Sequence, residues 1–275
     1  MKIFAIVICY NPDFNLLLKN VSAYQAFVEK IIIWDNTNPT IINVLKNNYF
    51  KNYSNIEYIT NNNNSGISQA LNYAWRYAKK NDYTAFMSMD QDSIWINFDV
   101  FFTLCKKKLK TETCILGPPI NKEVSSESHT LIPRNYIITS GMIIPTKILD
   151  SINGYPSEFF VDGIDIDICI KAKQKGYNIF VVQGCSLIQQ FGANLKFKFL
   201  HKTYPSSNYP PKRLYEIFRN HIIIYRRTHS SAVLRLIKGY FIVYLRAIVL
   251  FEDNKIKKIF AICKGIISGL IFKIH

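Results

Sequence analysis

The chain has 275 residues, 49% of them hydrophobic, and its formal net charge at pH 7 is +15. This length and apolar content are those of a globular protein, and they allow one large domain or a domain with an appendage. The excess of positive charge indicates an anionic partner, which is a nucleic acid, an anionic membrane surface or a phosphorylated substrate.

Targeting and redox signals are weak in this sequence. Its six cysteines form no Cys-x-x-Cys pair, as in a protein from a reducing compartment. Residues 1–10 resemble a strand and lack the cleavage site of a signal peptide. The apolar stretches near the C-terminus are interrupted by Arg246 and Lys264 and fall short of about 18 residues, so spanning helices are not expected. We therefore expect a cytoplasmic protein.

The first third of the chain alternates strand and helix patterns. Residues 3–10 form an apolar run that stops at Asn11, and residues 31–34 form a second run that stops at Asp35 and Asn36. A further step leads to a strand at residues 56–59. This alternation predicts a mostly parallel sheet with right-handed crossovers. The polar residues that end the strands, including the run 61–64, should then lie along one edge.

The segment from Asn64 to Gly66 opens a predicted helix. Gly66 would allow the backbone to approach a ligand closely, and the N–H groups of the first turn suit anionic oxygens. The alternative is that the asparagine run is a low-complexity turn.

Two carboxylates, Asp90 and Asp92, end the predicted strand at residues 84–89. The carboxyl edge of an open α/β sheet is where ligands bind. Carboxylates this close repel each other unless a cation or hydrogen-bond donors compensate, so the pair indicates Mg²⁺ or Mn²⁺. The alternative is a solvated turn, because Asp and Ser commonly close strands.

Two further segments contain candidate functional residues. Thr139, Ser140 and Gly141 interrupt a strand pattern at residues 136–145, as at a bulge or a close approach to a ligand. Acids at 162, 165 and 167 surround the first turn of a predicted helix that ends near residue 175. They either favour the helix dipole or include a catalytic base, and a helical conformation would make Asp162 and Asp165 project similarly.

The region 205–275 is predicted to be helical and basic, with 13 Lys and Arg against three Asp and Glu. Arg235, Lys238 and Arg246 fall within an arc of roughly 80° on a helical projection, and apolar residues cover the rest. This pattern is typical of a helix at a membrane surface. The alternative is that the same helix packs on the N-terminal domain.

Several motifs together resemble glycosyltransferase family 2, and within it a rhamnosyltransferase-like branch. The resemblance extends from residue 3 to about residue 192, with a weaker resemblance at Arg219 and Asn220 and at Gly265–Leu270. The motifs are Val7–Pro12, Trp34–Thr37, Asn64–Gly66 with Ala70 and Asn72, Asp90–Ser93, Thr139–Gly141 and Phe159–Asp165.

The resemblance implies a GT-A nucleotide-sugar fold in residues 1–204, followed by a C-terminal region at 205–275, and an inverting transfer. It assigns nucleotide binding to Asn11, Asp35, Asn36, Asn64 and Gly66, and contacts with the acceptor or donor sugar to Thr139, Ser140 and Gly141. It also assigns the metal to Asp90 and Asp92, and the general base to Asp165 with Asp162 and Asp167 nearby. Family members often have a histidine in the metal site, where this chain has Gln189; His201 is an alternative candidate.

The resemblance also implies partners. The expected donor is dTDP-rhamnose, with a UDP-hexose or UDP-galactofuranose as alternatives. The basic C-terminal region suggests that the acceptor is a lipid-linked saccharide made at the cytoplasmic leaflet, in the synthesis of a surface polysaccharide such as O-antigen or capsule. Two other hypotheses are a noncatalytic sugar-nucleotide binder and a basic nucleic-acid-binding protein. The latter lacks a recognised motif, so we expect no nucleic acid partner.

Overall fold

The computed structural model describes residues 1–38, 50, 52–60, 62–124, 130–190, 192–193, 195–199 and 202–274. Asn61 and His201, which were considered above, lie outside these ranges. The chain forms two compact units. The first contains Met1–Phe160 and Ile164–Gln189, and the second contains Val161–Gly163 and Gln190–His275.

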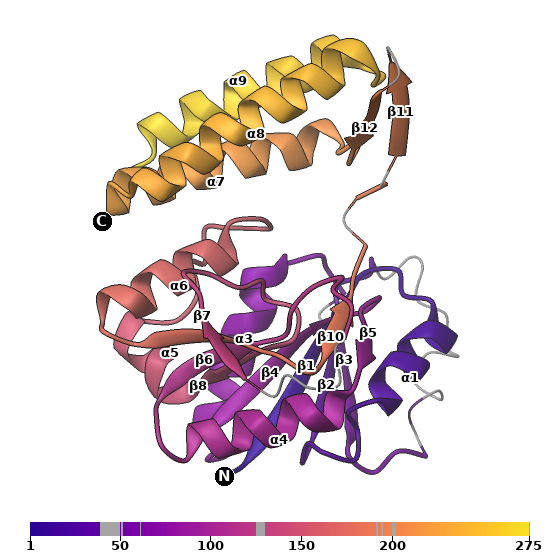
Figure 1. Cartoon of the computed structure of the whole chain (residues 1–275), viewed down its shortest axis with the longest axis vertical. Coiled ribbons are helices and arrows are strands. Elements are labelled where there is room, and N and C mark those ends of the chain that lie inside the picture. Colours follow the sequence, from indigo (N-terminus) through magenta and orange to yellow (C-terminus); the bar gives the residue numbers. More distant parts are fainter. Residues whose placement is uncertain are drawn as a thin grey trace. The chain divides into compact units, whose positions relative to one another are not determined.

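The first unit is built on an eight-stranded sheet with the order β3-β2-β1-β4-β8-β6-β9-β7 (Figure 1). Strands β3, β2, β1 and β4 pair in parallel, β6 pairs in parallel with β9, and β8 and β7 are antiparallel to their neighbours. The expected mostly parallel sheet is confirmed. The strands are β1 (Ile3–Cys9), β2 (Ile31–Asp35), β3 (Ile56–Thr60), β4 (Ala85–Asp90), β6 (Cys114–Gly117), β7 (Leu131–Pro133), β8 (Met142–Pro145) and β9 (Asn178–Val182).

Helices cover both faces of this sheet. They are α1 (Phe14–Ser22), α3 (Ile67–Lys80), α4 (Phe98–Leu109), α5 (Thr146–Ile152) and α6 (Ile164–Gln174). Alternate side chains of β1 point to opposite faces, because the side-chain period of a strand is two. Ala5 and Val7 join the core under α1 and α4, whereas Phe4 packs against Tyr77 of α3 on the other face.

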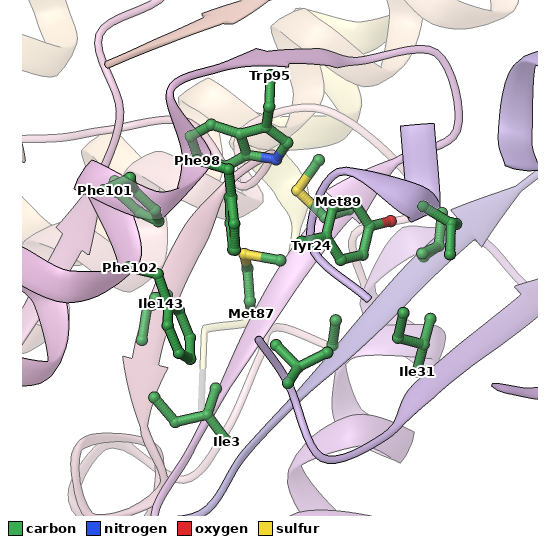
Figure 2. Close-up of a cluster of buried hydrophobic side chains, with 14 of the residues drawn as sticks. Ile3, Tyr24, Ile31, Met87, Met89, Trp95, Phe98, Phe101, Phe102 and Ile143 are labelled. Atoms are coloured by element: carbon green, nitrogen blue, oxygen red, sulfur yellow. The ribbon is translucent and has the colours of Figure 1, made fainter. Parts of the chain in front are cut away.

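The core under α1 and α4 is rich in aromatic and sulfur-containing side chains. Figure 2 shows Met87 and Met89 of β4 close to Phe98 and Trp95. The Trp95 and Phe98 rings lie 4.9 Å apart between centroids in an edge-to-face arrangement, which is a favoured geometry for aromatic pairs. This packing holds β4, and therefore its acidic end, in a fixed position.

A small second sheet closes one end of the first unit. Strand β5 (Ile94–Ile96) pairs antiparallel with β10 (Ser186–Ile188), and Ile94 lies opposite Ile188. Because β5 follows the Asp90–Ser93 turn directly, this pairing brings the residues after β10 to that turn.

The second unit contains a hairpin and three helices. The hairpin joins β11 (Leu195–Phe199) and β12 (Lys202–Ser206), and the helices are α7 (Pro211–Thr228), α8 (Ser231–Leu250) and α9 (Lys255–Ile271). The predicted helical C-terminal region is therefore confirmed. The compact unit begins at Gln190 and includes the hairpin, whereas the sequence placed a domain boundary between 204 and 205.

Small residues allow α9 to pack closely on α7. A Cβ atom at Gly265 would lie 2.5 Å from the Tyr215 carbonyl oxygen, and one at Gly269 would lie 2.8 Å from that of Arg219. Leu214, Ile217, Phe218, Ile248 and Ile262 form the core of the helices. Among the described residues, no helix combines the length and the apolar character that crossing a membrane requires.

Candidate active site

The carboxyl ends of four parallel strands meet at one edge of the sheet. Cys9 pairs with Asp35, Asp35 pairs with Thr60, and Ile8 pairs with Asp90. The strand ends that the sequence marked as polar are therefore neighbours. Asn11 follows β1 as an exposed residue with a left-handed backbone, and its N–H donates to Thr37 Oγ1 over 2.7 Å.

Asp35 is buried at this edge and accepts hydrogen bonds from neighbouring residues. Its side chain is 0% exposed, Oδ1 accepts the Thr37 N–H over 2.8 Å, and Oδ2 accepts the Tyr58 hydroxyl. Burial, followed by the hydrogen bond to Asp35, raises the pKa of Tyr58 well above its ordinary value, so the phenol stays a donor. A buried carboxylate with two donors holds the ends of β2 and β3 together.

Asn36 joins the end of β2 to the loop that begins α3. Its Oδ1 accepts from Trp34 Nε1 over 3.0 Å and from Ser65 Oγ over 3.2 Å, and its Nδ2 donates to the Gly66 carbonyl over 3.3 Å. Asn64 Oδ1 accepts the Gly66 N–H over 3.2 Å. These residues lie together as expected. The Asn36 amide makes its hydrogen bonds with protein groups and so holds the loop before α3 in place.

Gly66 is needed for a reason that the sequence does not reveal. Its φ is +81°, and a Cβ atom there would lie 2.6 Å from the carbonyl oxygen of Phe160. The same carbonyl accepts the Ile67 N–H, the first of helix α3, over 2.8 Å. The backbone at Gly66 is thus closely approached by Phe160, which belongs to the segment before α6.

The acidic turn after β4 is held by neutral side chains. Gln91 Oε1 accepts the Tyr10 N–H over 2.7 Å, and its Nε2 donates to the Tyr10 carbonyl over 3.1 Å. The Asp90 N–H donates to Ser140 Oγ over 3.2 Å. The Asp90 side chain is half-buried and Asp92 is exposed, so the turn presents two carboxylates of different accessibility.

Gln189 lies beside Asp90, where the sequence placed it. Its Nε2 donates to Asp90 Oδ2, and Asn121 exchanges two hydrogen bonds with its backbone over 3.0 and 2.8 Å. Gln189 Oε1 is buried and has no hydrogen-bond partner among the residues that the structure describes. A buried unpaired oxygen is costly, and a bound cation is one partner that would satisfy it.

The residues at this turn fit a hard divalent cation. Asp90, Asp92 and Gln189 offer carboxylate and amide oxygens, which are the ligands that Mg²⁺ and Mn²⁺ accept. Within the described ranges, no group of three or more His, Cys, Asp or Glu is arranged to hold a metal.

The segment Thr139–Gly141 lies against the end of β4. Ser88 Oγ donates to the Thr139 carbonyl over 2.6 Å, the Gly141 N–H donates to the Ser88 carbonyl over 2.7 Å, and the Ser140 and Ser93 hydroxyls lie 2.9 Å apart. Strand β8 begins only at Met142, so the segment precedes the strand instead of interrupting it. Gly141 packs against Pro118, because a Cβ atom at Gly141 would lie 2.8 Å from the Pro118 side chain.

The three acids near α6 have different environments. Asp165 is half-buried in the first turn, and its Oδ1 accepts the Ile166 N–H over 2.9 Å. Asp167 is 1% exposed and forms an ion pair of 2.6 Å with Lys171. Asp162 precedes the helix, has a left-handed backbone and belongs to the second unit. Asp162 and Asp165 therefore do not share a helical face.

Sequence reasoning missed the residues that fix this site without carrying charge. They include Tyr58, Gln91, Ser93 and Asn121, and each binds a residue distant in the sequence. Gln91 offered a weak signal because it lies between the two acids. Ser93 ends the same Asp90–Ser93 motif, whereas Tyr58 and Asn121 resemble ordinary strand or loop residues and have no distinctive spacing.

The first unit has the GT-A fold, the α/β fold of nucleotide-sugar transferases, with its acidic turn at the end of β4. Residues 4–104, a little over a third of the chain, match the model of glycosyl transferase family 2. No curated protein sequence matches the chain.

Three solved structures illustrate the fold. GalNAc-T7 with UDP, GalNAc and Mn²⁺ superposes with a TM-score of 0.63 at 12% identity, over 87% of this chain and 54% of that chain, so this chain spans about half of its length. TarS 1-349 of S. aureus in complex with UDP-GlcNAc gives 0.60 at 16% identity, over 98% and 81%. The mannosyltransferase PcManGT from Pyrobaculum calidifontis, in complex with GDP-Man and Mn²⁺, gives 0.56 at 12% identity, over 97% and 73%.

Proposed function

We propose that the chain is an inverting glycosyltransferase that moves a sugar from a nucleotide-sugar donor to a saccharide acceptor. The observation that carries the proposal is the pairing of Asp90 with Gln189 at the carboxyl edge of a GT-A sheet, the same edge at which the buried Asp35 and Asn36 lie. The family match over residues 4–104 supports the same reaction class.

The proposed roles follow from the chemistry of displacement at an anomeric carbon. Asn11, Asp35, Asn36, Asn64 and Gly66 form the nucleotide side of the site. Asp90, Asp92 and Gln189 would hold Mg²⁺ or Mn²⁺, which when bound offsets negative charge on the departing diphosphate. Thr139, Ser140 and Gly141 would line the sugar position.

Asp165 would act as the general base. Removing the proton from the acceptor hydroxyl as it attacks contributes about 10²–10⁴-fold to the rate. Attack on the face opposite the departing diphosphate inverts the anomeric centre. Asp167 would support this role through its ion pair with Lys171 in the same helix, and Asp162 through the segment that leads into it.

For the donor we propose dTDP-rhamnose, because the Asp-Gln-Asp-Ser turn resembles that of the rhamnosyltransferase-like branch. A UDP-hexose or UDP-galactofuranose is the alternative within the same fold. Of the solved neighbours, TarS was crystallised with UDP-GlcNAc and PcManGT with GDP-Man. This spread of nucleotides makes the donor the first property to measure.

The test is thermal unfolding with dTDP, UDP, GDP or CDP, each with and without Mg²⁺ or Mn²⁺. A ligand at about 100 times its Kd adds roughly 2.7 kcal/mol of stability. Cation-dependent stabilisation by dTDP alone supports the rhamnosyl donor, and stabilisation by UDP alone supports the alternatives. A response only to single-stranded nucleic acid would contradict the proposal and support the basic nucleic-acid-binding hypothesis.

The catalytic role is tested by Asp165→Asn. We expect this variant to lose sugar transfer, measured by mass spectrometry of the acceptor, while donor binding in a calorimeter is retained. Asp99→Asn is a matched control, because Asp99 is an exposed acid in the first turn of another helix. Full transfer by Asp165→Asn would contradict the assignment of the base.

For the acceptor we propose a lipid-linked saccharide, with the protein held at the anionic inner face of the cell membrane, in surface polysaccharide synthesis such as that of O-antigen or capsule. An exposed apolar stripe on α9 supports this location. Ile256 and Phe260 are 85% and 69% exposed, and Cys263, Ile267 and Leu270 continue the stripe with alternating spacings of four and three residues.

The charge beside the stripe favours a membrane over a second copy of the chain. Exposed Lys257 and Lys264 flank the stripe, and α9 contains no acidic residue. Pairing of two such helices would bring lysines together, whereas anionic lipids attract each basic residue by about 1 kcal/mol. The proposed surface therefore lies on α9 in addition to the face of α8 that the sequence identified.

A further inference from the structure

The segment Val161–Gly163 is unusual because it precedes α6 in the chain but forms part of the second compact unit. The chain leaves the first unit after Phe160 and returns to it at Ile164. Asp162 and Gly163 both have left-handed backbones, with φ of +57° and +80°. Only Asp162 carries a conformational cost, because glycine adopts a positive φ readily, and such a residue persists where its surroundings determine the conformation.

Arg213 of α7 binds the side chain of Asp162 with both arms of its guanidinium. Its Nε donates to Oδ2 and its terminal nitrogen to Oδ1, each over 3.0 Å. The guanidinium also lies 4.2 Å from the ring centroid of Tyr209. A two-point pairing between Arg and a carboxylate fixes orientation as well as position, which lysine cannot do.

Asn220, two turns further along α7, binds the backbone of the same segment. Its side chain is 0% exposed, and its Nδ2 donates to the carbonyl oxygens of Val161 and Asp162 over 2.8 and 3.0 Å. Its Oδ1 accepts from Arg219 over 2.9 Å. The two donors of this amide are thus used on one short loop, and the acceptor is oriented by a neighbouring cation.

Gly163 completes the arrangement. A Cβ atom there would lie 3.2 Å from Ile224 Cδ1 and 3.4 Å from Asn220 Cβ, so the loop lies directly on the surface of α7. We call Asp162, Arg213 and Asn220 the clasp. Asp162 lies two residues before the start of α6 at Ile164.

We propose that Arg213 and Asn220 are positioning residues for transfer, which fix the loop Val161–Gly163 and through it the direction in which Asp165 enters the site. Asp165 follows Gly163 by two residues, so rotation of the loop backbone is transmitted to it along the chain. The inference rests on the proposed role of Asp165 as general base.

The test uses the full-length protein with a water-soluble acceptor. Arg213→Lys retains the charge but not the two-point geometry, and Asn220→Asp retains the shape but replaces the amide donor. A displacement of about 1 Å at a reacting group can cost 10²-fold in rate, so we expect kcat to fall by about this factor in both variants. The KM for the donor should change little in both variants, and the melting temperature should change little in Arg213→Lys, whereas Asn220→Asp should lower it because a buried carboxylate then faces two carbonyl oxygens. Arg76→Lys, on an exposed face of α3, is the matched control.

A double-mutant cycle separates positioning from general damage. If Arg213 acts through Asp165, Arg213→Lys should cost far less in the residual transfer rate of an Asp165→Asn background, measured at high enzyme concentration, because the group that it positions is already absent. Equal cost in both backgrounds would overturn the inference, as would a parallel loss of donor binding or folding in both single variants.

The outcomes also distinguish this inference from the proposed function. If Asp165→Asn is inactive but Arg213→Lys and Asn220→Asp keep normal kcat, the clasp has no role in transfer and the proposed base stands. If Asp165→Asn transfers sugar normally, the proposed base is wrong and the clasp inference falls with it.

Discussion

At the scale of single residues, glycines mark where the backbone is under the tightest constraint. Gly66 combines a φ of +81° with a contact that a Cβ atom would make at 2.6 Å, whereas Gly176 has a φ of +84° and nothing within 4 Å. A comparison of alanine substitutions at the two positions therefore separates two contributions to the loss of stability: the strained φ angle, and the steric clash between the added Cβ atom and the Phe160 carbonyl.

We expect Gly176→Ala to lower the free energy of unfolding by about 1 kcal/mol and Gly66→Ala to lower it by more, because only the latter collides with the Phe160 carbonyl. Gly239→Ala, in α8 with ordinary φ and open space, should raise the stability by roughly 0.5–1 kcal/mol. Urea unfolding of the three variants provides the comparison. Equal effects at Gly66 and Gly176 would show that the Phe160 backbone can move away from the added Cβ atom without a loss of stability.

Single residues also show why part of the site could not be predicted. Asp35 and Asn36 were identified because each ends a strand, and they do lie at the expected edge. Their hydrogen-bond partners Tyr58 and Ser65 come from other elements, and nothing in the spacing of the sequence connects them. A polar residue at a strand end predicts where a site lies, but which of its atoms remain available depends on the tertiary packing.

At the scale of elements, the strands and most helices follow from periodicity alone. Buried runs such as residues 3–9 and 31–35 match β1 and β2, since a strand covered on both faces is apolar throughout. The reversal of direction at β8 could not be predicted in this way. A parallel and an antiparallel strand can have the same composition, and the difference lies in how the chain returns to the sheet.

Helix α9 provides the prediction that belongs to this scale. We expect Phe260→Glu with Ile267→Glu to weaken binding to vesicles that contain anionic phosphatidylglycerol, because both changes remove apolar contact and add negative charge. The matched control is Ile94→Glu with Tyr136→Glu, on exposed positions of the first unit. Co-sedimentation at low and high salt measures binding, which should weaken as salt screens the lysines.

Two results would contradict this prediction. Equal binding by wild type and the α9 variant would exclude the stripe as the membrane surface. A concentration-dependent dimer that the α9 substitutions dissociate, observed by analytical ultracentrifugation without lipid, would assign the stripe to a second copy of the chain.

At the scale of the whole molecule, stability should depend on pH through a buried histidine in α7. Burial lowers the pKa of His221 below its ordinary value, against smaller opposing effects of the Ile217 carbonyl and Asp162. Its ring also packs edge-on against Tyr240, with centroids 5.2 Å apart. The folded protein therefore holds this imidazole neutral at pH values where the unfolded chain is already protonated.

The sign follows from proton binding. Below about pH 6.5 the unfolded chain binds a proton that the folded chain does not, so the free energy of unfolding should fall as the pH is lowered toward the folded pKa, by at most about 1.4 kcal/mol per pH unit. His221→Gln should remove this part of the slope. Urea titrations of both proteins between pH 7.5 and 4.5 provide the measurement, and parallel curves would contradict it.

The clasp also has a consequence for the order of events during synthesis. Asn220 lies 59 residues after Val161, the residue whose carbonyl it binds. At roughly 5–20 residues per second, the ribosome needs about 3–12 s to add this stretch. Helix α6 is thus complete in sequence several seconds before α7 exists to fasten the loop ahead of it. A nascent chain released within that interval would contain Asp165 in a fully synthesised α6, but it would lack Arg213 and Asn220, which bind the loop before that helix.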